Sequence, residues 1–583
     1  MDGIINVGGE MSGARDGRFL PHAVILGTAA LALGWQLLFP GLYHIALDDA
    51  LILPKYAPQM MQAFREGVVY PRWMPGDVGG YGSPMFVYYS PLLYVLAAVI
   101  GLAGLALAHS KLLIELLRLY LGAYFLFLLV RESRGEKAGY LAAFFYVLLP
   151  TRMLDLYAIN SPASRFSQAF LPMSLYFAKA YVQGRYPRRG LLYAALPYTG
   201  LALSHLATAY IFTPLLFAWC ALGMDRPRLK NVLKGSAIIL AGLTLAASFF
   251  VPVLLERGHA QFAYMGRFVH QGNFILAPPQ GLVHSDTETL RLKFSGSVVF
   301  EFGLALFLLY VAWKRGGYRP GREAVYFAGA SAACFFMMSP LSAPVWDLLP
   351  GMGEVQFPGR FENLNLVFVS AVLGVAASAL PSPGRMPKAF LALGAVLAVA
   401  ILAADAKVIL ESKPFSEETA AAAARDAIFP EYLPKGVDPA TAESLRAPGP
   451  KITFVDNVPM AKNVTDSSNA QAHGQPAGTG EDGRVEIKKW GSAERTFTVS
   501  TPGPATVRVR TFYFPGWRAY IDGGETGIRS EPKTGAILVD VPPGMHEVRL
   551  RFTDTWPRTV GAAITLVTFA VLLLNPLSRH LKI

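Results

Sequence analysis

The run FLPHAVILGTAALALGWQLLFPGL, from Phe19 to Leu42, decides the fold class, because it is long enough to cross a lipid bilayer as a helix. It follows two arginines and is longer than the apolar core of a signal peptide, so we interpret it as a retained signal-anchor helix. The chain continues as YHIALDDALILPKY, Tyr43 to Tyr56, with two adjacent carboxylates, Asp48 and Asp49. Acids beside a membrane helix need a structural or a chemical reason, since charge is costly there.

The composition predicts a polytopic membrane protein. Of the 583 residues, 53% are hydrophobic and only 16% are charged, whereas a soluble domain is about a quarter charged. The net charge of +12 comes largely from short loops between apolar runs, which indicates membrane orientation and argues against a nucleic-acid partner. Both cysteines, Cys220 and Cys334, lie in apolar runs, which excludes a disulfide framework and a thiolate metal site.

Apolar runs of helix length recur along the chain, and we expect about 12 of them to cross the membrane. They cover 20–42, 91–108, 114–131, 138–152, 166–182, 190–204, 206–222, 232–254, 298–313, 323–338, 364–380, 387–404 and 558–577. This predicts an α-helical membrane domain over 1–404 and a final transmembrane helix with a cytoplasmic tail over 556–583.

The polar stretch 405–555 predicts a separate domain. It contains the alternating runs ATVRVRTFYF and AILVDV, separated by the turn signals PG, DGG and PPG. Alternation with a period of two, interrupted by such turns, is typical of antiparallel strands. We therefore expect a β-sandwich between the last two membrane helices.

Lysine and arginine positions predict the orientation. About 20 of the 52 basic residues lie in short loops such as RESRGEK and GRYPRRG, which the positive-inside rule places in the cytoplasm. All these loops share one side if the run 91–108 only enters the membrane or lies along it. In the alternative, 91–108 crosses, 190–222 is one long span, and two basic loops lie outside.

The preferred topology leaves the polar segments 43–113, 153–165, 255–297 and 339–363 outside, with the β-rich domain and the turn near His205. The acidic pair at the start of the first segment has two interpretations. It caps the helix that follows and meets its dipole, or it acts as a general base or a cation ligand. The same segment continues with YPRW and with the glycine-rich turn GGYGSP.

These motifs resemble those of a known family. The series DD, REG, YPRW and GGYGSPMFVYYSPLLY is similar to the first outer loop of bacterial multi-pass GT-C-type glycosyltransferases. More narrowly, it resembles the branch labelled 6-pyruvoyl-tetrahydropterin-synthase-related membrane proteins and the YfhO-like proteins. SHLATAY, MSPLSAPVWDLLP with VQFPGRF, and FYFPGWRAYIDG with VPPGMHEVRLRF resemble later parts of these proteins. The resemblance covers most of the chain and implies a GT-C-like membrane domain with an extracytoplasmic β-domain.

The resemblance implies an enzyme that takes a sugar from a polyprenyl-phosphate donor at the outer face of a bacterial inner membrane. An aspartate early in the first outer loop is the expected catalytic carboxylate, and the spacing to YPRW matches Asp49 to it, with Asp48 beside it. Asp48 and Leu53 stand where the branch has histidines, which weakens a metal-bound or histidine-assisted base. Whether a divalent cation, Mg²⁺ or Mn²⁺, takes part is left open, and no other cofactor is expected.

The outer segments supply candidate substrate ligands, each with a structural alternative. The structural alternative for Asp155 is an ion pair with Arg152, and the alternative for Glu256 is an ion pair with Arg257. The structural alternative for His205 is a hydrogen-bonded histidine at a helix turn. The candidates for contacts to sugar or phosphate are Arg72, Trp73, Tyr81, Asp155, Asn160, Arg165, His205, Glu256 and Arg360.

Arg360 and Arg72 compete as the phosphate ligand, because a guanidinium stays charged and binds phosphate in a fork. The branch carries a tryptophan where Gly359 precedes Arg360, and a glutamate close to Ser164. The second departure leaves the chain without the second acid that the resemblance would supply.

We predict an inverting glycosyltransferase whose acceptor is a hydroxyl of a glycan, a lipid or a cell-envelope polymer, and which works among membrane lipids. The alternatives are a non-catalytic protein of envelope assembly and a transporter of lipid-linked glycans. Transport is disfavoured because the predicted spans look free of mid-span charges and the chain has no visible internal repeat.

Overall fold

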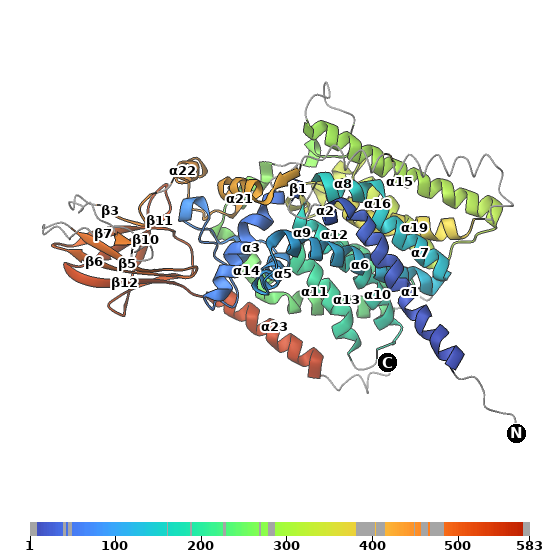
Figure 1. Cartoon of the computed structure of the whole chain (residues 1–583), viewed down its shortest axis with the longest axis horizontal. Coiled ribbons are helices and arrows are strands. Elements are labelled where there is room, and N and C mark those ends of the chain that lie inside the picture. The colour runs from blue at the N-terminus through green and yellow to red at the C-terminus, as the bar shows by residue number, and fades with distance from the viewer. Residues whose placement is uncertain are drawn as a thin grey trace.

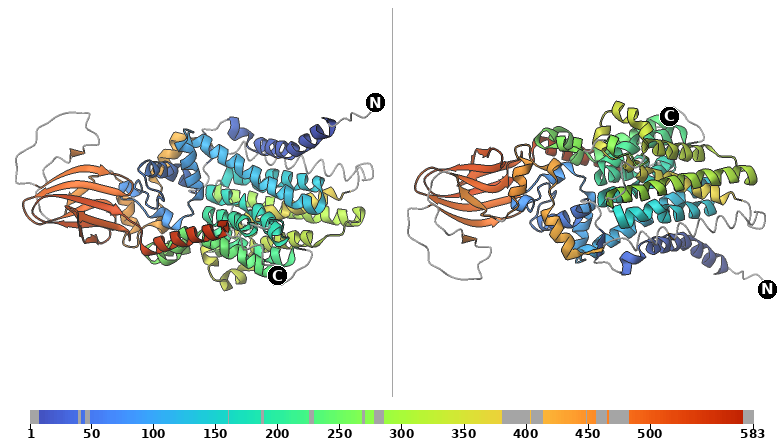
Figure 2. Two further views of the ribbon diagram at one scale, coloured as in Figure 1. Left: turned by 90° about the horizontal axis from the view of Figure 1, so that it is seen from below. Right: turned by 90° about the horizontal axis from the view of Figure 1, so that it is seen from above.

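A helical domain and a β-rich domain lie end to end in the computed structural model (Figure 1). The structure describes residues 8–38, 42–44, 49–159, 161–186, 189–224, 229–267, 270–277, 286–380, 403, 414–447, 449–455, 465–466 and 483–574. The strands after residue 450 occupy one end of the long axis, and α23 (Trp556–Leu574) returns from them along the side of the helices (Figure 2). Along the described residues, helices come first, most of the strands follow, and α23 comes last.

The helical domain centres on α19, which packs against α7, α15 and α16. Gly374 permits the close approach to α7, since a Cβ atom there would lie 2.5 Å from the backbone nitrogen of Ala142. The helices are α1 (Gly8–Ala32), α2 (Gly34–Leu38), α3 (Asp49–Arg65), α5 (Leu92–Leu102), α6 (Leu107–Arg134), α7 (Glu136–Leu148), α8 (Pro150–Leu154), α9 (Pro162–Ser167), α10 (Phe170–Val182), α11 (Gly190–Ser204), α12 (Leu206–Leu222), α13 (Leu229–Leu245), α14 (Ala247–Leu255), α15 (Asp286–Gly316), α16 (Arg322–Met337), α17 (Ala343–Leu348) and α19 (Glu362–Ser378).

Five described helical stretches are long and apolar enough to span a membrane: Leu107–Arg134, Glu136–Ile159, Leu290–Gly316, Pro358–Ser378 and Trp556–Leu574. Two further pairs, α13 with α14 and α16 with the segment Pro340–Leu348, are bent by 78° and 89° and raise the number to 7 if each is one span. The prediction of about 12 crossings is therefore not confirmed within the described residues. The predicted span 387–404 lies outside them, apart from Ala403.

Two details bear on the predicted topology. Helix α5 has 11 residues and is about 16 Å long, which is too short to cross a bilayer. This length agrees with the preferred topology, in which 91–108 does not cross the membrane. Helices α11 and α12 fold back on each other at His205. The hydroxyls of Tyr198 and Thr213 show this, since they lie 2.6 Å apart. In one straight helix these residues would be about 22 Å apart. The alternative of a single span over 190–222 is wrong.

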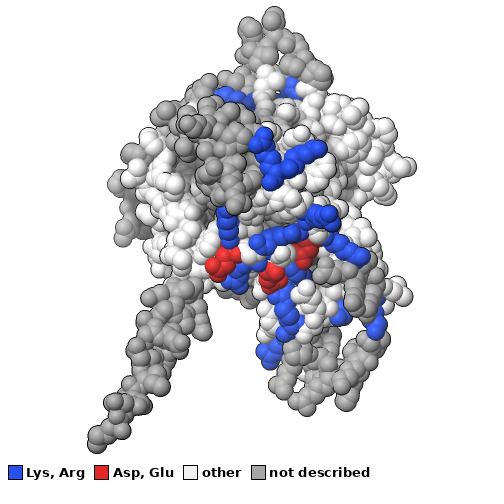
Figure 3. Space-filling model, turned by 90° about the vertical axis from the view of Figure 1, so that its right-hand side faces the viewer, with Lys and Arg blue, Asp and Glu red and all other residues white. Residues whose placement is uncertain are grey.

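Basic side chains gather at the end of the molecule opposite the strands (Figure 3). Arg131 and Arg134 lie in the last turn of α6, and Lys314 and Arg315 in that of α15. Lys179 of α10 joins the same end by ion pairs of 3.4 Å to Glu132 and 2.7 Å to Glu323. Loops far apart in the sequence thus share one face, as the positive-inside argument predicts, and the strands lie at the other end.

The β-rich domain contains two larger sheets whose strand orders are β10-β11-β7-β3 and β4-β5-β6-β12-β8-β9. Both contribute to one hydrophobic cluster, for example Val507 and Val539 from the first and Phe497 and Val548 from the second. The β-rich domain is confirmed, and the sandwich arrangement stays a prediction. The strands are β3 (Ile452–Phe454), β4 (Thr465–Asp466), β5 (Arg484–Trp490), β6 (Glu494–Thr501), β7 (Ala505–Phe512), β8 (Trp517–Ile521), β9 (Gly524–Thr526), β10 (Ile528–Ser530), β11 (Ala536–Val541) and β12 (Gly544–Phe552).

The first part of the predicted 405–555 domain is attached to the helical domain. Strand β2 (Pro414–Ser416) pairs with β1 (Leu42–His44), and α21 (Glu417–Asp426) packs against α3. The segment 43–113, which we call the first outer segment, therefore contacts both the helices and the residues that lead into the β-rich domain, and α3 begins at Asp49.

Candidate functional site

Of the two predicted catalytic acids, the structure describes only Asp49. Asp49 is the first residue of α3, and Asp48 lies outside the described residues, as does the candidate ligand Asn160. Strand β1 ends at His44 and pairs with β2, so Asp49 begins α3 five residues after a strand that is tied to the segment Pro414–Ser416. The roles of both acids stay predictions.

A third aspartate of the first outer segment, Asp77, organises its glycine-rich turn. Its carboxylate pairs with Lys55 at 3.1 Å and accepts hydrogen bonds from the hydroxyls of Tyr56, at 2.8 Å, and Ser83. Its backbone oxygen accepts from the amides of the glycines at 80 and 82. Sequence reasoning missed Asp77, and its contacts give it a structural role in positioning the segment.

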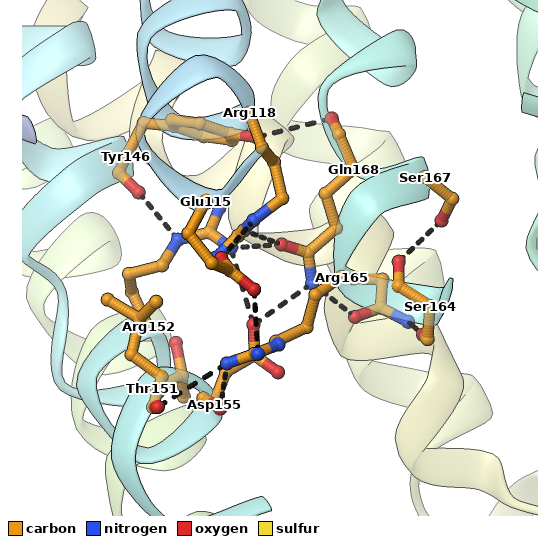
Figure 4. Close-up of polar contacts among 12 residues, drawn as sticks. Glu115, Arg118, Tyr146, Thr151, Arg152, Asp155, Ser164, Arg165, Ser167 and Gln168 are labelled. Atoms are coloured by element: carbon orange, nitrogen blue, oxygen red, sulfur yellow. Dashed lines mark hydrogen bonds and ion pairs between the residues drawn. The ribbon is translucent and has the colours of Figure 1, made fainter. Parts of the chain in front are cut away.

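A buried polar network connects α6, α8, α9 and the π-helical segment η2 (Asp155–Ile159) (Figure 4). Glu115, which is 4% exposed, lies between two guanidinium groups. It accepts from Arg118 Nε at 2.8 Å and pairs with Arg165 Nη2 at 2.7 Å. Breaking such a buried pair leaves an uncompensated charge, so this contact fixes α9 against α6.

Gln168 holds the other half of the network. Its Oε1 atom accepts from Arg118 Nη1 at 2.9 Å and also from Arg152 Nη1. Its Nε2 atom donates to Asp155 Oδ2 at 3.4 Å, and Arg152 Nη1 lies 3.5 Å from the same oxygen. The predicted pairing of Asp155 with Arg152 is therefore present, within a wider network rather than at the surface. We call the set Glu115, Arg118, Arg152, Asp155, Arg165 and Gln168 the arginine network.

The arginine network lies about one membrane thickness from the basic end. Nineteen residues of α6 separate Glu115 from Arg134, which is about 28 Å of helix. The hydrocarbon layer of a bilayer is about 30 Å thick. If the basic end lies at the cytoplasmic surface, the network is at the outer boundary of the membrane, below the first outer segment.

The candidate Arg360 and a further polar residue, Asn363, lie next to the arginine network. Asn363 at the start of α19 accepts from Gln168 Nε2 at 2.6 Å and donates to Ser164 Oγ at 2.8 Å. Arg360 stands one turn earlier, in the 3₁₀ segment η7 (Pro358–Phe361), and donates to the backbone oxygen of Val355 at 2.8 Å. Arg360 thus belongs to the same end of the helical domain as Asp155 and Arg165.

His205 forms the turn between α11 and α12. Its Nδ1 atom accepts from the backbone nitrogen of Thr208 at 3.2 Å and lies 2.7 Å from the Thr208 hydroxyl, so the imidazole caps α12. The segment η7 packs against α12. The structural interpretation of His205 therefore accounts for its Nδ1 atom, and its position beside η7 is compatible with the predicted site role.

The remaining candidates lie at the junction with the β-rich domain. The indole of Trp73 packs on Trp517 and Phe552, each with ring centroids 5.4 Å apart. The ring of Tyr81 stacks on Phe512 at 4.9 Å, and Tyr81 O accepts the amide of Phe512 at 2.8 Å. These contacts show Trp73 and Tyr81 attaching the first outer segment to β7 and β8.

Glu256 and Arg72 lie on the membrane side of this junction. Glu256 pairs with Arg558 of α23 at 2.8 Å and also accepts from the Thr555 hydroxyl, whereas the neighbouring Arg257 pairs with Glu354. The structural alternative in which Glu256 pairs with Arg257 is therefore wrong. Arg72 donates to the backbone oxygen of Ser248 at 3.1 Å and lies 3.4 Å from Asp554.

The structure therefore divides the predicted ligands into two groups. Asp155, Arg165 and Arg360 lie at or beside the arginine network, with His205 on the turn next to η7. Arg72, Trp73, Tyr81 and Glu256 lie at the β-domain junction. Sequence reasoning missed four residues of the first group, of which Glu115 and Arg118 carried a signal, because charges in an apolar span are expected to be functional. The missed residues are Glu115, Arg118, Gln168 and Asn363.

A family model described as "6-pyruvoyl-tetrahydropterin synthase related domain; membrane protein" matches residues 86–412, more than half of the chain. The chain belongs to this family of membrane proteins. A Lactococcus lactis subsp. cremoris protein, described only as uncharacterized, is 24% identical over 228 residues, which is 37% of this chain and 36% of that protein.

Two solved glycosyltransferases are partly similar in structure. The arabinofuranosyltransferase AftD from Mycobacteria has a TM-score of 0.42 and 20% identity, over 68% of this chain and 27% of AftD. The apo oligosaccharyltransferase of Archaeoglobus fulgidus has a TM-score of 0.41 and 15% identity, over 74% of this chain and 57% of that protein. The matches thus span about a third of the Lactococcus protein and about a quarter of AftD.

Proposed function

We propose that this PTPS-related membrane protein is a GT-C-type glycosyltransferase of the bacterial inner membrane. It moves a sugar from a polyprenyl-phosphate donor to an acceptor hydroxyl of a glycan, a lipid or an envelope polymer at the outer face. The main support is the convergence of charged side chains from α6, η2 and α9, joined by Gln168 to Asn363 at the start of α19, about one membrane thickness from the basic end. Charge buried at that depth is costly unless it is used.

In the proposed reaction, Asp49 takes the proton of the acceptor hydroxyl. The hydroxyl oxygen forms a bond to the anomeric carbon, while the bond from that carbon to the phosphate oxygen breaks. The phosphate leaves with the bonding electrons as lipid phosphate, and the direct displacement inverts the anomeric centre. A leaving phosphate is already ionised, so the step needs no strong general acid.

Arg360 is the proposed phosphate ligand. A guanidinium binds phosphate through charge-assisted hydrogen bonds, and Arg360 lies one turn from Asn363, which bonds the arginine network. The competing Arg72 is engaged by Asp554 and by Ser248 O at the junction. A divalent cation on Asp48 and Asp49 stays an open prediction, and no step here depends on one.

The test is transfer from radiolabelled polyprenyl-phosphate sugars by the full chain in proteoliposomes. Asp49→Asn should lower the transfer rate by at least about a hundredfold, because general-base catalysis contributes about that much or more. The matched control is Glu418→Gln, which removes an exposed carboxylate from α21, the helix that packs on α3.

Full activity of Asp49→Asn would remove Asp49 from the mechanism. If the wild type transfers none of the sugars, a flipping assay on the same vesicles distinguishes the two alternatives. Movement of the lipid-linked sugar across the bilayer would favour a transporter, and no movement would favour a non-catalytic assembly protein.

A further inference from the structure

A cavity of about 460 Å³ lies at the junction of the two domains, apart from the arginine network. Its walls come from the first outer segment, the turn between β5 and β6, the end of β12, and helices α14 and α23. Its lining includes Tyr70, Arg72, Arg551, Asp554 and Ala562. The proposed reaction does not use this space, and Trp73 and Phe552, whose rings attach the β-domain, form part of its wall.

The cavity has an excess of positive charge. Arg72 is 6% exposed and pairs with Asp554, so these two charges compensate each other. Arg551 is exposed, and within the described part of the chain its guanidinium makes no ion pair or hydrogen bond. Its neighbour on the strand, Arg549, is bonded to Glu494 at 2.7 Å. Arg551 is therefore the uncompensated cation of the cavity, which favours an anionic ligand.

The hydroxyl of Tyr70 also lacks a partner. Its oxygen is buried and has no hydrogen-bond partner among the described residues, and burial raises the pKa of Tyr70 to about 12. The Arg72 guanidinium lies over the Tyr70 ring at 3.9 Å, which holds both side chains on the same wall. A buried hydroxyl without a partner costs free energy unless a ligand supplies an acceptor.

The cavity extends to the depth of membrane lipid. Ala562 lies six residues inside α23, about 9 Å below its first residue, Trp556. Val69, which lines the cavity, is 92% exposed, and Trp556, the first residue of α23, is 68% exposed. A ligand that places an anion at Arg551 and an apolar chain beside α23 would satisfy both ends, which is the chemistry of a lipid with a phosphate headgroup.

We propose that this junction cavity binds the phosphate group of a membrane lipid at the outer interface, through Arg551 and the Tyr70 hydroxyl. The site is separate from the reaction centre and does not depend on glycosyl transfer. Because it lies between the strands and α14 and α23, a bound lipid would contact both domains at once.

The test measures binding to the purified full chain in detergent, followed by tryptophan fluorescence, since Trp73 lines the cavity. The probes are dihexanoyl phosphatidylglycerol, farnesyl phosphate, inorganic phosphate and maltotriose. We expect saturable binding of at least one of the two lipids, and much weaker binding of inorganic phosphate and maltotriose. The stronger of the two lipids identifies the source of the phosphate.

Arg551→Gln should weaken lipid binding about tenfold, and the matched control Arg549→Gln, on the same strand and outside the cavity, should not change it. Tyr70→Phe should also weaken binding, while the thermal unfolding midpoint without lipid stays equal or rises, because the variant removes a buried hydroxyl that lacks a partner. Equal effects of Arg551→Gln and Arg549→Gln would overturn the proposal. Binding of inorganic phosphate or maltotriose as tight as that of the lipids would overturn it too.

Discussion

Two buried carboxylates, Glu115 and Glu256, face arginines in different ways. Glu256 is 3% exposed, and all three guanidinium nitrogens of its partner Arg558 are bonded, to Glu256, to Thr553 O and to Pro515 O. Arg558 also lies over the rings of Phe514 and Phe552. All the nitrogens of this guanidinium therefore have partners within the pair and its surroundings, and the pair joins α14 to α23.

Glu115 instead belongs to a network that stays open. It bonds arginines from two helices, and Gln168 extends the contacts to Asn363 beside the proposed phosphate ligand. At the far side of the network, Arg152 Nη2 is buried without a hydrogen-bond partner among the described residues. Glu115 and Glu256 are both buried and paired, so these two properties alone do not identify a ligand-binding site. A fully satisfied pair indicates assembly, whereas a network with unused donors indicates a place where a ligand can bind.

The largest expected effect is that of Glu115→Gln. The change leaves Arg118 and Arg165 buried without their carboxylate, and breaking one buried pair costs about 3–5 kcal/mol. We expect the free energy of unfolding in detergent to fall by about 4 kcal/mol or more. Glu132→Gln is the control on the same helix, because Glu132 is partly exposed at the basic end and should cost about 1 kcal/mol or less. Equal losses in the two variants would contradict the comparison.

Glu256→Gln should have a smaller effect of a different kind. It leaves one buried arginine, so we expect a loss of about 3 kcal/mol in the free energy of unfolding. The double variant Glu256→Leu with Arg558→Met should be more stable than either single change, since apolar residues can replace a buried pair. Transfer activity of Glu256→Gln, measured well below its unfolding midpoint, should equal that of the wild type. Lost activity in the folded variant would restore the predicted substrate role of Glu256.

Local features of the fold could be predicted from the sequence. AILVDV corresponds to β11, and the DGG signal marks the two-residue turn between β8 and β9, where Asp522 has a φ of 50° and Gly523 of 85°. Such a turn needs positive φ at both positions, which the pair Asp-Gly provides. The run 114–131 lies within α6. In each case the deciding physics acts between residues close in sequence.

The partners of buried charges could not be predicted in the same way. Glu256 meets Arg558, 302 residues away, rather than the adjacent Arg257, because the packing of α14 against α23 decides the contact. The prediction that the spans are free of mid-span charges overlooked Glu115 and Arg118, which lie near the end of α6 opposite Arg131 and Arg134. Their spacing of three residues places them on one helix face. Trp73 and Tyr81 were predicted to contact a ligand, and the structure shows them packed on Trp517 and Phe512. The sequence could not indicate this packing, because an exposed aromatic residue and one buried against another domain have the same local sequence pattern.

The smallest expected effect concerns an exposed pair, His546 with Asp522 at 2.6 Å, beside the same turn. The hydrogen bond to Asp522 raises the pKa of His546, and the hydrogen bond from His546 lowers the pKa of Asp522. The histidine contributes stability below about pH 6.5 and loses it as the pH rises through its folded pKa, whereas the aspartate contributes above about pH 3.9. The pair is therefore complete between these values.

Hydrogen–deuterium exchange of the Glu547 amide, which donates to Asp522 at 2.8 Å, can follow this pair in the full chain. Compared with His546→Gln at the same pH, the wild type should be most protected near pH 5.5, and the difference should shrink above the folded pKa of His546. Arg518→Gln is the control, because it breaks an exposed ion pair of the same hairpin, with Glu525, that contains no histidine. A difference between wild type and His546→Gln that does not vary with pH would mean that the histidine acts by packing alone. The exposed pair would then stabilise its turn without titrating, as the buried pair of Glu256 and Arg558 is expected to stabilise α14 against α23.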